Sequence, residues 1–210
     1  MFKHAAVTCT LLTDGSSDRV LLPIIRWLMD LHCGQEYRLI FARLVASGGH
    51  GLAARIEAAS HQYPCHVLFV HRDAEREPPA YRHQEITDAW SSANRPSGIE
   101  IGLVTIVPVR MTEAWLLLDE VAVRHAAGNP NGRAALSLPS AERVEHLPDP
   151  KEVLFAALRM ACELPAGRRR KFRPEAHLHR VPEMMTSFEA LRALPSFRQL
   201  ETQVQQLFAA

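Results

Sequence analysis

The chain has 210 residues, of which 47% are hydrophobic and 22% charged, a composition typical of a globular protein rather than a disordered one. Its formal net charge is +1, so contact with a polyanion would depend on a local basic patch and not on overall attraction. No apolar run approaches the roughly 20 residues that span a bilayer, and the four cysteines are scattered without a CxxC pair. We therefore expect a cytoplasmic protein without a secretory leader, a membrane segment, a disulfide framework or a zinc site.

Strands and helices are predicted to alternate along the first 120 residues. The four consecutive apolar residues Val67–Val70 are typical of a strand covered on both faces, as in the middle of a parallel sheet. The alternating order favours an α/β fold, with a mainly parallel open sheet and helices on both of its faces. The predicted strands cover 4–13, 37–44, 67–70 and 99–109, and the predicted helices cover 18–31, 52–62, 84–93 and a segment that begins at Thr112.

The character of the chain changes at Gly128, where turn residues and prolines become frequent. Helical spacing of apolar residues returns over 151–162, 182–193 and 196–208. We therefore expect an α/β domain over residues 1–127 and an appended helical and loop region, packed on it, over 128–210. The glycine-rich turn Ala46–Gly51 is either a plain connection or a turn whose backbone N–H groups hold phosphate.

Acidic residues follow three of the predicted strands. Ligands of open α/β sheets bind beyond the carboxyl ends of the strands, so these carboxylates are expected to converge on one edge. Several carboxylates suit Mg²⁺ or Mn²⁺, which stabilise charge in phosphoryl transfer, and grouping them without a cation is costly. A solvated, charged turn is the alternative interpretation. The acidic residues are Asp14 and Asp18 after the first strand, Asp73 and Glu75 after the third, and Glu113 after the fourth.

The only dense basic run lies near residue 170. It consists of Arg168, Arg169, Arg170, Lys171 and Arg173. These side chains could contact the phosphates of a nucleic acid, with Phe172 available to stack on a base. A solvated basic loop is the alternative.

Three segments together resemble the TOPRIM domain, the topoisomerase–primase fold that also occurs in OLD-family nucleases and in small bacterial proteins. They are LLTDGSSDRVLLPII, LFVHRDAE and PVRMTEAWLLLD, and the resemblance covers about residues 5–120. In that family a first strand ends in an acid followed by glycine, and a later strand ends in an Asp-x-Asp pair that binds Mg²⁺. Two departures stand out: the first acid, usually glutamate, is Asp14, and the pair is His71-Arg72-Asp73.

The resemblance implies a nuclease that acts on DNA or RNA with Mg²⁺ or Mn²⁺, linked to bacterial defence and to a partner protein of the same system. Asp73 and Glu75 would hold metal, with Asp14 and Asp18 completing the site, and Asp14, Asp73 and Glu113 would be catalytic. The first ligand of the pair is either His71 or is replaced by the Asp73 and Glu75 pair, and imidazole suits softer metals than Mg²⁺. Mn²⁺ dependence or a degenerate site therefore stays open. The alternative function is a catalytically weak module that binds nucleic acid or a partner protein.

Overall fold

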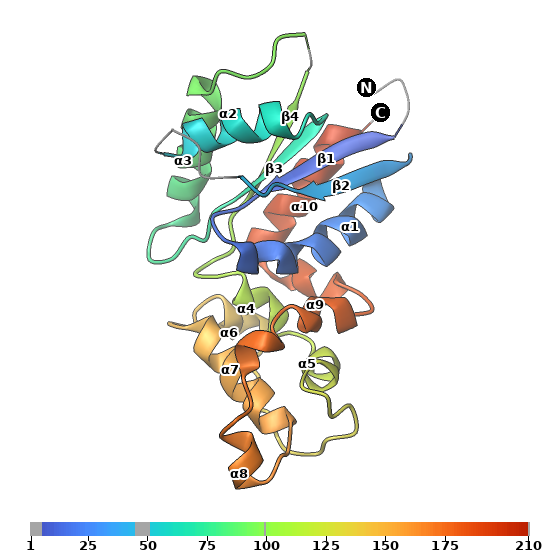
Figure 1. Cartoon of the computed structure of the whole chain (residues 1–210), viewed down its shortest axis with the longest axis vertical. Coiled ribbons are helices and arrows are strands. Elements are labelled where there is room, and N and C mark those ends of the chain that lie inside the picture. The colour runs from blue at the N-terminus through green and yellow to red at the C-terminus, as the bar shows by residue number, and fades with distance from the viewer. Residues whose placement is uncertain (1–5, 45–50, 99, 210) are drawn as a thin grey trace.

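The computed structural model describes residues 6–44, 51–98 and 100–209 of the chain (Figure 1). Its centre is a four-stranded, all-parallel sheet in the order β2-β1-β3-β4. The strands are β1 (Val7–Leu12), β2 (Tyr37–Phe41), β3 (Val67–His71) and β4 (Gly102–Ile106). All five residues of β3 are buried, as expected for an inner strand of a parallel sheet. The predicted α/β fold is confirmed.

Helices cover both faces of this sheet (Figure 1). Successive strand residues point to opposite faces, so neighbours in β3 enter different cores: Phe69 belongs to the larger one and Leu68 to the smaller one. The larger core contains the apolar faces of α1 (Leu21–His32) and α10 (Pro195–Phe208). The smaller core contains Ile56 of α2 (Leu52–Gln62) and Ile86 of α3 (Pro79–Ser92).

Short helices form the rest of the chain, below the sheet in Figure 1. Their core is continuous with the larger core of the sheet, because Trp115, Leu154 and Phe197 belong to the same buried cluster as Phe69. The C-terminal helix α10 returns to the sheet and packs against β4 and α1. The α-helices are α4 (Glu113–Leu116), α5 (Glu120–Ala126), α6 (Ala141–Val144), α7 (Pro150–Ala161), α8 (Ala166–Arg169) and α9 (Arg180–Met184). The 3₁₀ turns are Ser16–Val20, Pro174–Ala176 and Glu189–Ala193.

Three helix predictions need correction. The helix predicted over 84–93 begins earlier, at Pro79, because Pro78 and Pro79 start it instead of preceding it. The helix predicted from Thr112 is interrupted after Leu116, and a second one starts at Glu120, where the Asp119 side chain accepts a hydrogen bond from the Ala122 amide and caps it. The single helix predicted over 182–193 is wrong: α9 ends at Met184, Met185 is extended, and only a 3₁₀ turn follows. Of the glycine-rich turn Ala46–Gly51, only Gly51 lies within the described residues, so its phosphate-binding interpretation is outside them.

None of the helices in the described ranges combines the length and the apolar character needed to cross a bilayer.

Candidate functional site

Four of the five predicted acidic residues line one cavity at the carboxyl edge of the sheet. The volume of this cavity is about 310 Å³. Parallel strands present their carboxyl ends on the same side, so the segments that leave β1 and β3 meet there. We call this cavity the acidic cavity; its lining residues are Asp14, Gly15, Ser17, Asp18, His71, Arg72, Asp73 and Glu75.

At the inner wall of the acidic cavity, His71 is buried between two carboxylates. It is the last residue of β3, and only 2% of its surface is exposed. Its Nε2 lies 3.2 Å from Asp73 Oδ1 and 3.0 Å from Thr112 Oγ1, both at hydrogen-bond distance. Its Nδ1 lies 3.4 Å from Asp18 Oδ2, an ion-pair distance whose geometry does not meet that of a hydrogen bond. Burial lowers the pKa of His71, but the two carboxylates outweigh it and raise the pKa to about 9. The ring is therefore an imidazolium at neutral pH.

Asp18 reaches this histidine from the 3₁₀ turn that follows β1. Its Oδ2 accepts a hydrogen bond of 3.1 Å from the Gly15 amide, and Ser17 Oγ donates to its Oδ1 at 3.3 Å. Burial raises the pKa of Asp18, yet the neighbouring His71 and these hydrogen bonds oppose it, and the net direction is downward. The Asp18 carboxylate is therefore stabilised in its charged form.

Asp73 is held by the loop that follows β4. Pairing with that segment continues past the end of β3, through hydrogen bonds from the Arg72 amide to Ile106 O and from the Ala74 amide to Pro108 O, both 3.0 Å long. This extension places Asp73 Oδ1 2.9 Å from the Thr112 amide, which donates to it. Among the described residues, nothing bonds to Asp73 Oδ2. One oxygen of Asp73 is thus fixed, and the other is available.

Two arginines form ion pairs with the carboxylate of Asp14. Arg55, from α2, forms an ion pair with its Oδ1, and Arg72 Nε lies 2.8 Å from its Oδ2. Arg72 also contacts Glu85 at 3.2 Å. The proton-transfer role that the resemblance implies for Asp14 needs a free carboxylate oxygen, and here both oxygens are paired. In this arrangement Asp14 positions the two guanidinium groups.

The other two predicted acids differ in their surroundings. Glu75 lies at the mouth of the acidic cavity with its side chain 67% exposed, 3.3 Å from Arg82. Glu113, the first residue of α4, does not line the cavity and is 7% exposed. Burial raises the pKa of Glu113, and the charge of Asp73 adds to this, while Lys151, whose Nζ lies 3.5 Å from Glu113 Oε1, opposes it. Glu113 is thus a buried carboxyl behind the cavity.

Within the described residues, no three His, Cys, Asp or Glu side chains are grouped so that together they could hold a metal ion. The reason is visible in the contacts of the acidic cavity. His71 lies between Asp18 and Asp73, and arginines engage Asp14, so protein cations offset most of the carboxylates that sequence reasoning assigned to a metal.

The basic run lies far from this edge, at the end of the helical region around α8 (Figure 1). All five of its basic side chains are exposed, and none forms an ion pair with a described residue. Phe172 stacks on the His177 ring, with ring centroids 4.4 Å apart, and packs against the larger core. One contact of the Phe172 ring is thus already made within the protein, and its stacking on a base stays a prediction.

Sequence reasoning missed four residues of the site. Arg55 and Thr112 come from segments distant in sequence, and only the sheet topology brings them to the end of β3. Arg72 carried a weak signal, because it lies inside the His-x-Asp segment. Lys151 carried none beyond the scarcity of lysine in the chain.

No protein-family model matches the chain, and neither a curated protein nor a solved structure matches it. The likeness to the TOPRIM domain therefore rests on the three quoted segments and on the position of their acidic residues.

Proposed function

We propose that the protein carries out divalent-metal-dependent phosphodiester chemistry on nucleic acid, as a nuclease. The observation that carries the proposal is the acidic cavity, in which carboxylates from the ends of β1 and β3 gather beside two arginines at the carboxyl edge of a parallel sheet. The resemblance of residues 5–120 to the TOPRIM domain supports the same function. The four cysteines are free and buried, which supports a reducing, cytoplasmic location.

The residues present fit a hard cation that binds few protein ligands. Mg²⁺ keeps several waters and is held by one or two carboxylates together with substrate phosphates, rather than by a cage of protein side chains. Asp73 has one oxygen without a partner among the described residues, and the exposed Glu75 lines the same cavity. Asp73 and Glu75 would hold Mg²⁺ or Mn²⁺, which when bound supplies positive charge at the phosphate and activates water.

The chain's own side chains would orient this site. The His71 imidazolium and Thr112 hold one oxygen of Asp73 by hydrogen bonds. This fixes the orientation of the carboxylate, and therefore the position of its other oxygen. Asp14 holds the guanidinium groups of Arg55 and Arg72 at the cavity, where their remaining N–H groups can donate to a phosphate. These donors offset the repulsion between a polyanion and the acidic edge.

A specific observation also favours the alternative, a catalytically weak module that binds nucleic acid or a partner. His71, Arg55 and Arg72 already compensate the charges of Asp14, Asp18 and Asp73 without a metal. Such a module would retain the fold and the acidic cavity, and would bind nucleic acid without cleaving it.

Replacing Asp73 distinguishes the two functions. Asp73→Asn keeps the shape of the side chain but removes the charge that a hard cation needs. For the nuclease, we expect Mn²⁺ binding measured by calorimetry to be lost, and cleavage of single- and double-stranded DNA and RNA to fall by at least about a hundredfold, the scale of losing a main electrostatic contribution. Asp88→Asn, on the exposed face of α3, is the matched control and should behave as wild type.

The stability of the variants must be measured alongside. The sequence alone suggests that removing one of several clustered acids relieves repulsion, but the structure reverses this, because Asp73 faces the His71 imidazolium and its loss is destabilising. Glu75→Gln is therefore the second variant, since its side chain is exposed and its change should leave the melting temperature unaltered. Binding and cleavage that survive both substitutions would refute the metal site and favour the module.

A further inference from the structure

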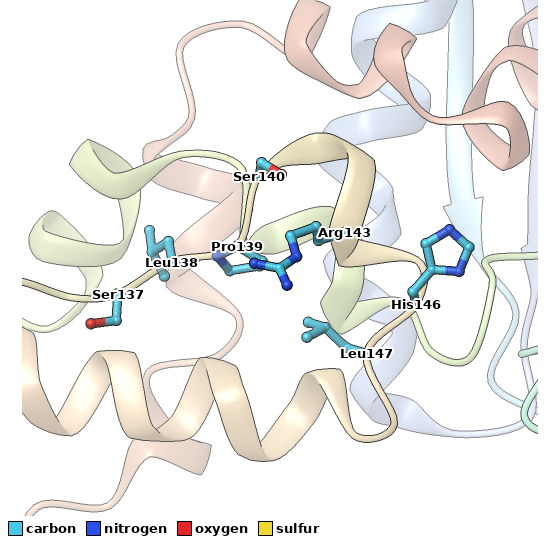
Figure 2. A pocket seen from close by; sticks show the side chains of 7 residues that line it. All are labelled: Ser137, Leu138, Pro139, Ser140, Arg143, His146 and Leu147. Carbon is cyan, nitrogen blue, oxygen red and sulfur yellow. The ribbon is translucent and has the colours of Figure 1, made fainter.

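A second cavity, with a volume of about 600 Å³, lies in the helical region and shares no residue with the acidic cavity. It is formed by the segment before α6, by α6 itself and by the turn that follows it (Figure 2). Its lining residues are Ser137, Leu138, Pro139, Ser140, Arg143, His146 and Leu147. Its volume is within the range of about 300–1,000 Å³ that is usual for small-molecule sites.

The polar groups of this cavity are donors without partners. Arg143 forms no ion pair or side-chain hydrogen bond with a described residue, and the same holds for His146. Ser140 occupies the N-cap position of α6, yet its hydroxyl makes no capping hydrogen bond. No acidic residue lines the cavity, and Glu145, the nearest one along the chain that is not exposed, already accepts a hydrogen bond from Ser196. Glu142 of α6 is exposed and does not line the cavity, so Arg143 is the charged side chain of the lining and forms no ion pair with a described residue.

The apolar side chains of the lining, unlike its polar ones, are held in place by packing. Leu138 and Leu147 are partly buried and pack against the larger core of the protein. Figure 2 shows Pro139, Arg143 and Leu147 around one space, with the guanidinium group between the two apolar side chains. An apolar body would thus contact Leu138, Pro139 and Leu147 while its charged end reached Arg143.

We propose that this cavity binds a small amphiphilic anion, in which an apolar body of several carbons carries one carboxylate or phosphate group. Arg143 provides the paired N–H donors that planar or tetrahedral oxyanions accept in bidentate fashion. Contact with the apolar side chains then favours ligands with a longer apolar chain, because each buried methylene group adds to affinity. The site is independent of the proposed nuclease chemistry, because its lining contains none of the acidic residues.

Calorimetric titration of the full chain with sodium octanoate, octyl phosphate, butyrate, inorganic phosphate and octanol tests the proposal. We expect saturable binding of octanoate or octyl phosphate at one site per chain, and the tighter of the two identifies the charged group. Inorganic phosphate and octanol should each bind at least about tenfold more weakly because each lacks one of the two contacts, and butyrate should do so because its apolar chain is short.

Arg143→Gln should weaken binding of the tighter ligand by about tenfold or more, and Arg143→Lys by less, because lysine keeps the charge without the paired donors. Arg133→Gln changes an exposed arginine of the same connecting segment that does not line the cavity, and should leave affinity unaltered. Both arginines are exposed, so the variants should fold as wild type does. The proposal is overturned if neither amphiphile binds saturably, if Arg143→Gln binds as wild type does, or if inorganic phosphate or octanol binds as tightly as the amphiphiles.

Discussion

His71 is a buried histidine that lies between two carboxylates. An imidazole with 2% of its surface exposed would lose its proton on burial, but Asp18 and Asp73 on either side keep it charged. Because its pKa of about 9 in the folded chain exceeds the value of 6.5 for an unperturbed histidine, protonation is linked to folding.

The sign of this linkage gives a prediction for stability. A raised pKa contributes stability that is complete below about pH 6.5 and is lost as the pH rises through about 9. The shift corresponds to roughly 3 kcal/mol, at about 1.4 kcal/mol for each pKa unit. We expect urea unfolding of the wild type to show a fall in the free energy of unfolding between pH 6.5 and 9 that His71→Gln lacks.

His61→Gln, at an exposed histidine of α2, is the matched control and should keep the wild-type slope. If His71→Gln and wild type show parallel stability profiles over this pH range, the ring is neutral in the folded protein. His71 would then be held by its hydrogen bonds at Nε2, to Asp73 and Thr112, without an ion pair to Asp18.

The predictability of the site differs from residue to residue. The convergence of Asp14, Asp18, Asp73 and Glu75 could be predicted, because parallel strands bring the residues after them to one edge. Their partners could not be predicted, because the sequence does not encode directly which distant side chain faces a carboxylate. Arg55 approaches Asp14 only once α2 has packed on the sheet.

At the scale of elements, the sheet was easier to predict than the helical region. Strands such as β3 are apolar along their whole length, and the limits of α2 were predicted without error because its apolar spacing is regular. The segment from 182 to 193 has apolar residues at helical spacing too, but it wraps around the core as α9, an extended turn and a 3₁₀ turn. Tertiary packing determines the conformation of such short segments, and the spacing of apolar residues within them does not reveal that packing.

A buried hydrogen bond joins the elements of the helical region. Trp115, in α4, is fully buried and its Nε1 donates to Ser196 Oγ in α10 at 3.0 Å; Ser196 in turn donates to Glu145 after α6. The Trp115 ring also meets Phe197 edge to face, with centroids 5.6 Å apart. Ser196 thus connects three segments that are distant in sequence.

Ser196→Ala should therefore lower the free energy of unfolding by more than the small size of the serine side chain suggests. It removes the acceptor of a buried indole N–H, and such an unpaired group costs about 1–3 kcal/mol. We expect chemical denaturation to show a loss of that size in the free energy of unfolding. Ser91→Ala, on the exposed face of α3, should lose under about 0.5 kcal/mol. Equal effects of the two substitutions would mean that the indole N–H finds another acceptor.

The basic run lies apart from the acidic cavity, whose carboxylates are themselves largely paired with arginines and His71. Acidic groups gather at the carboxyl edge of the sheet, while the exposed Arg168, Arg169 and Arg170 lie at the opposite end of the helical region, beyond α7 (Figure 1). With a net charge of +1, the chain has no overall attraction for a polyanion. A nucleic acid drawn to the molecule would therefore be held first by the basic end, and would have to extend along the helical region to reach the acidic cavity.

Replacing Arg168, Arg169 and Arg170 with alanine tests this arrangement. If the run contacts phosphates, affinity for nucleic acid should fall and the slope of log K against log salt should flatten by about 2–3, since each neutralised phosphate contributes about 0.7–0.9. The control replaces three scattered, exposed arginines, Arg26, Arg38 and Arg133, so that net charge changes equally while the run stays intact. A similar loss in both triple variants would mean that overall charge governs binding. Suppose instead that only the variant of the basic run loses affinity, and that short oligonucleotides bind without being cleaved. The distance from α8 to the acidic cavity would then set the minimum length of a substrate.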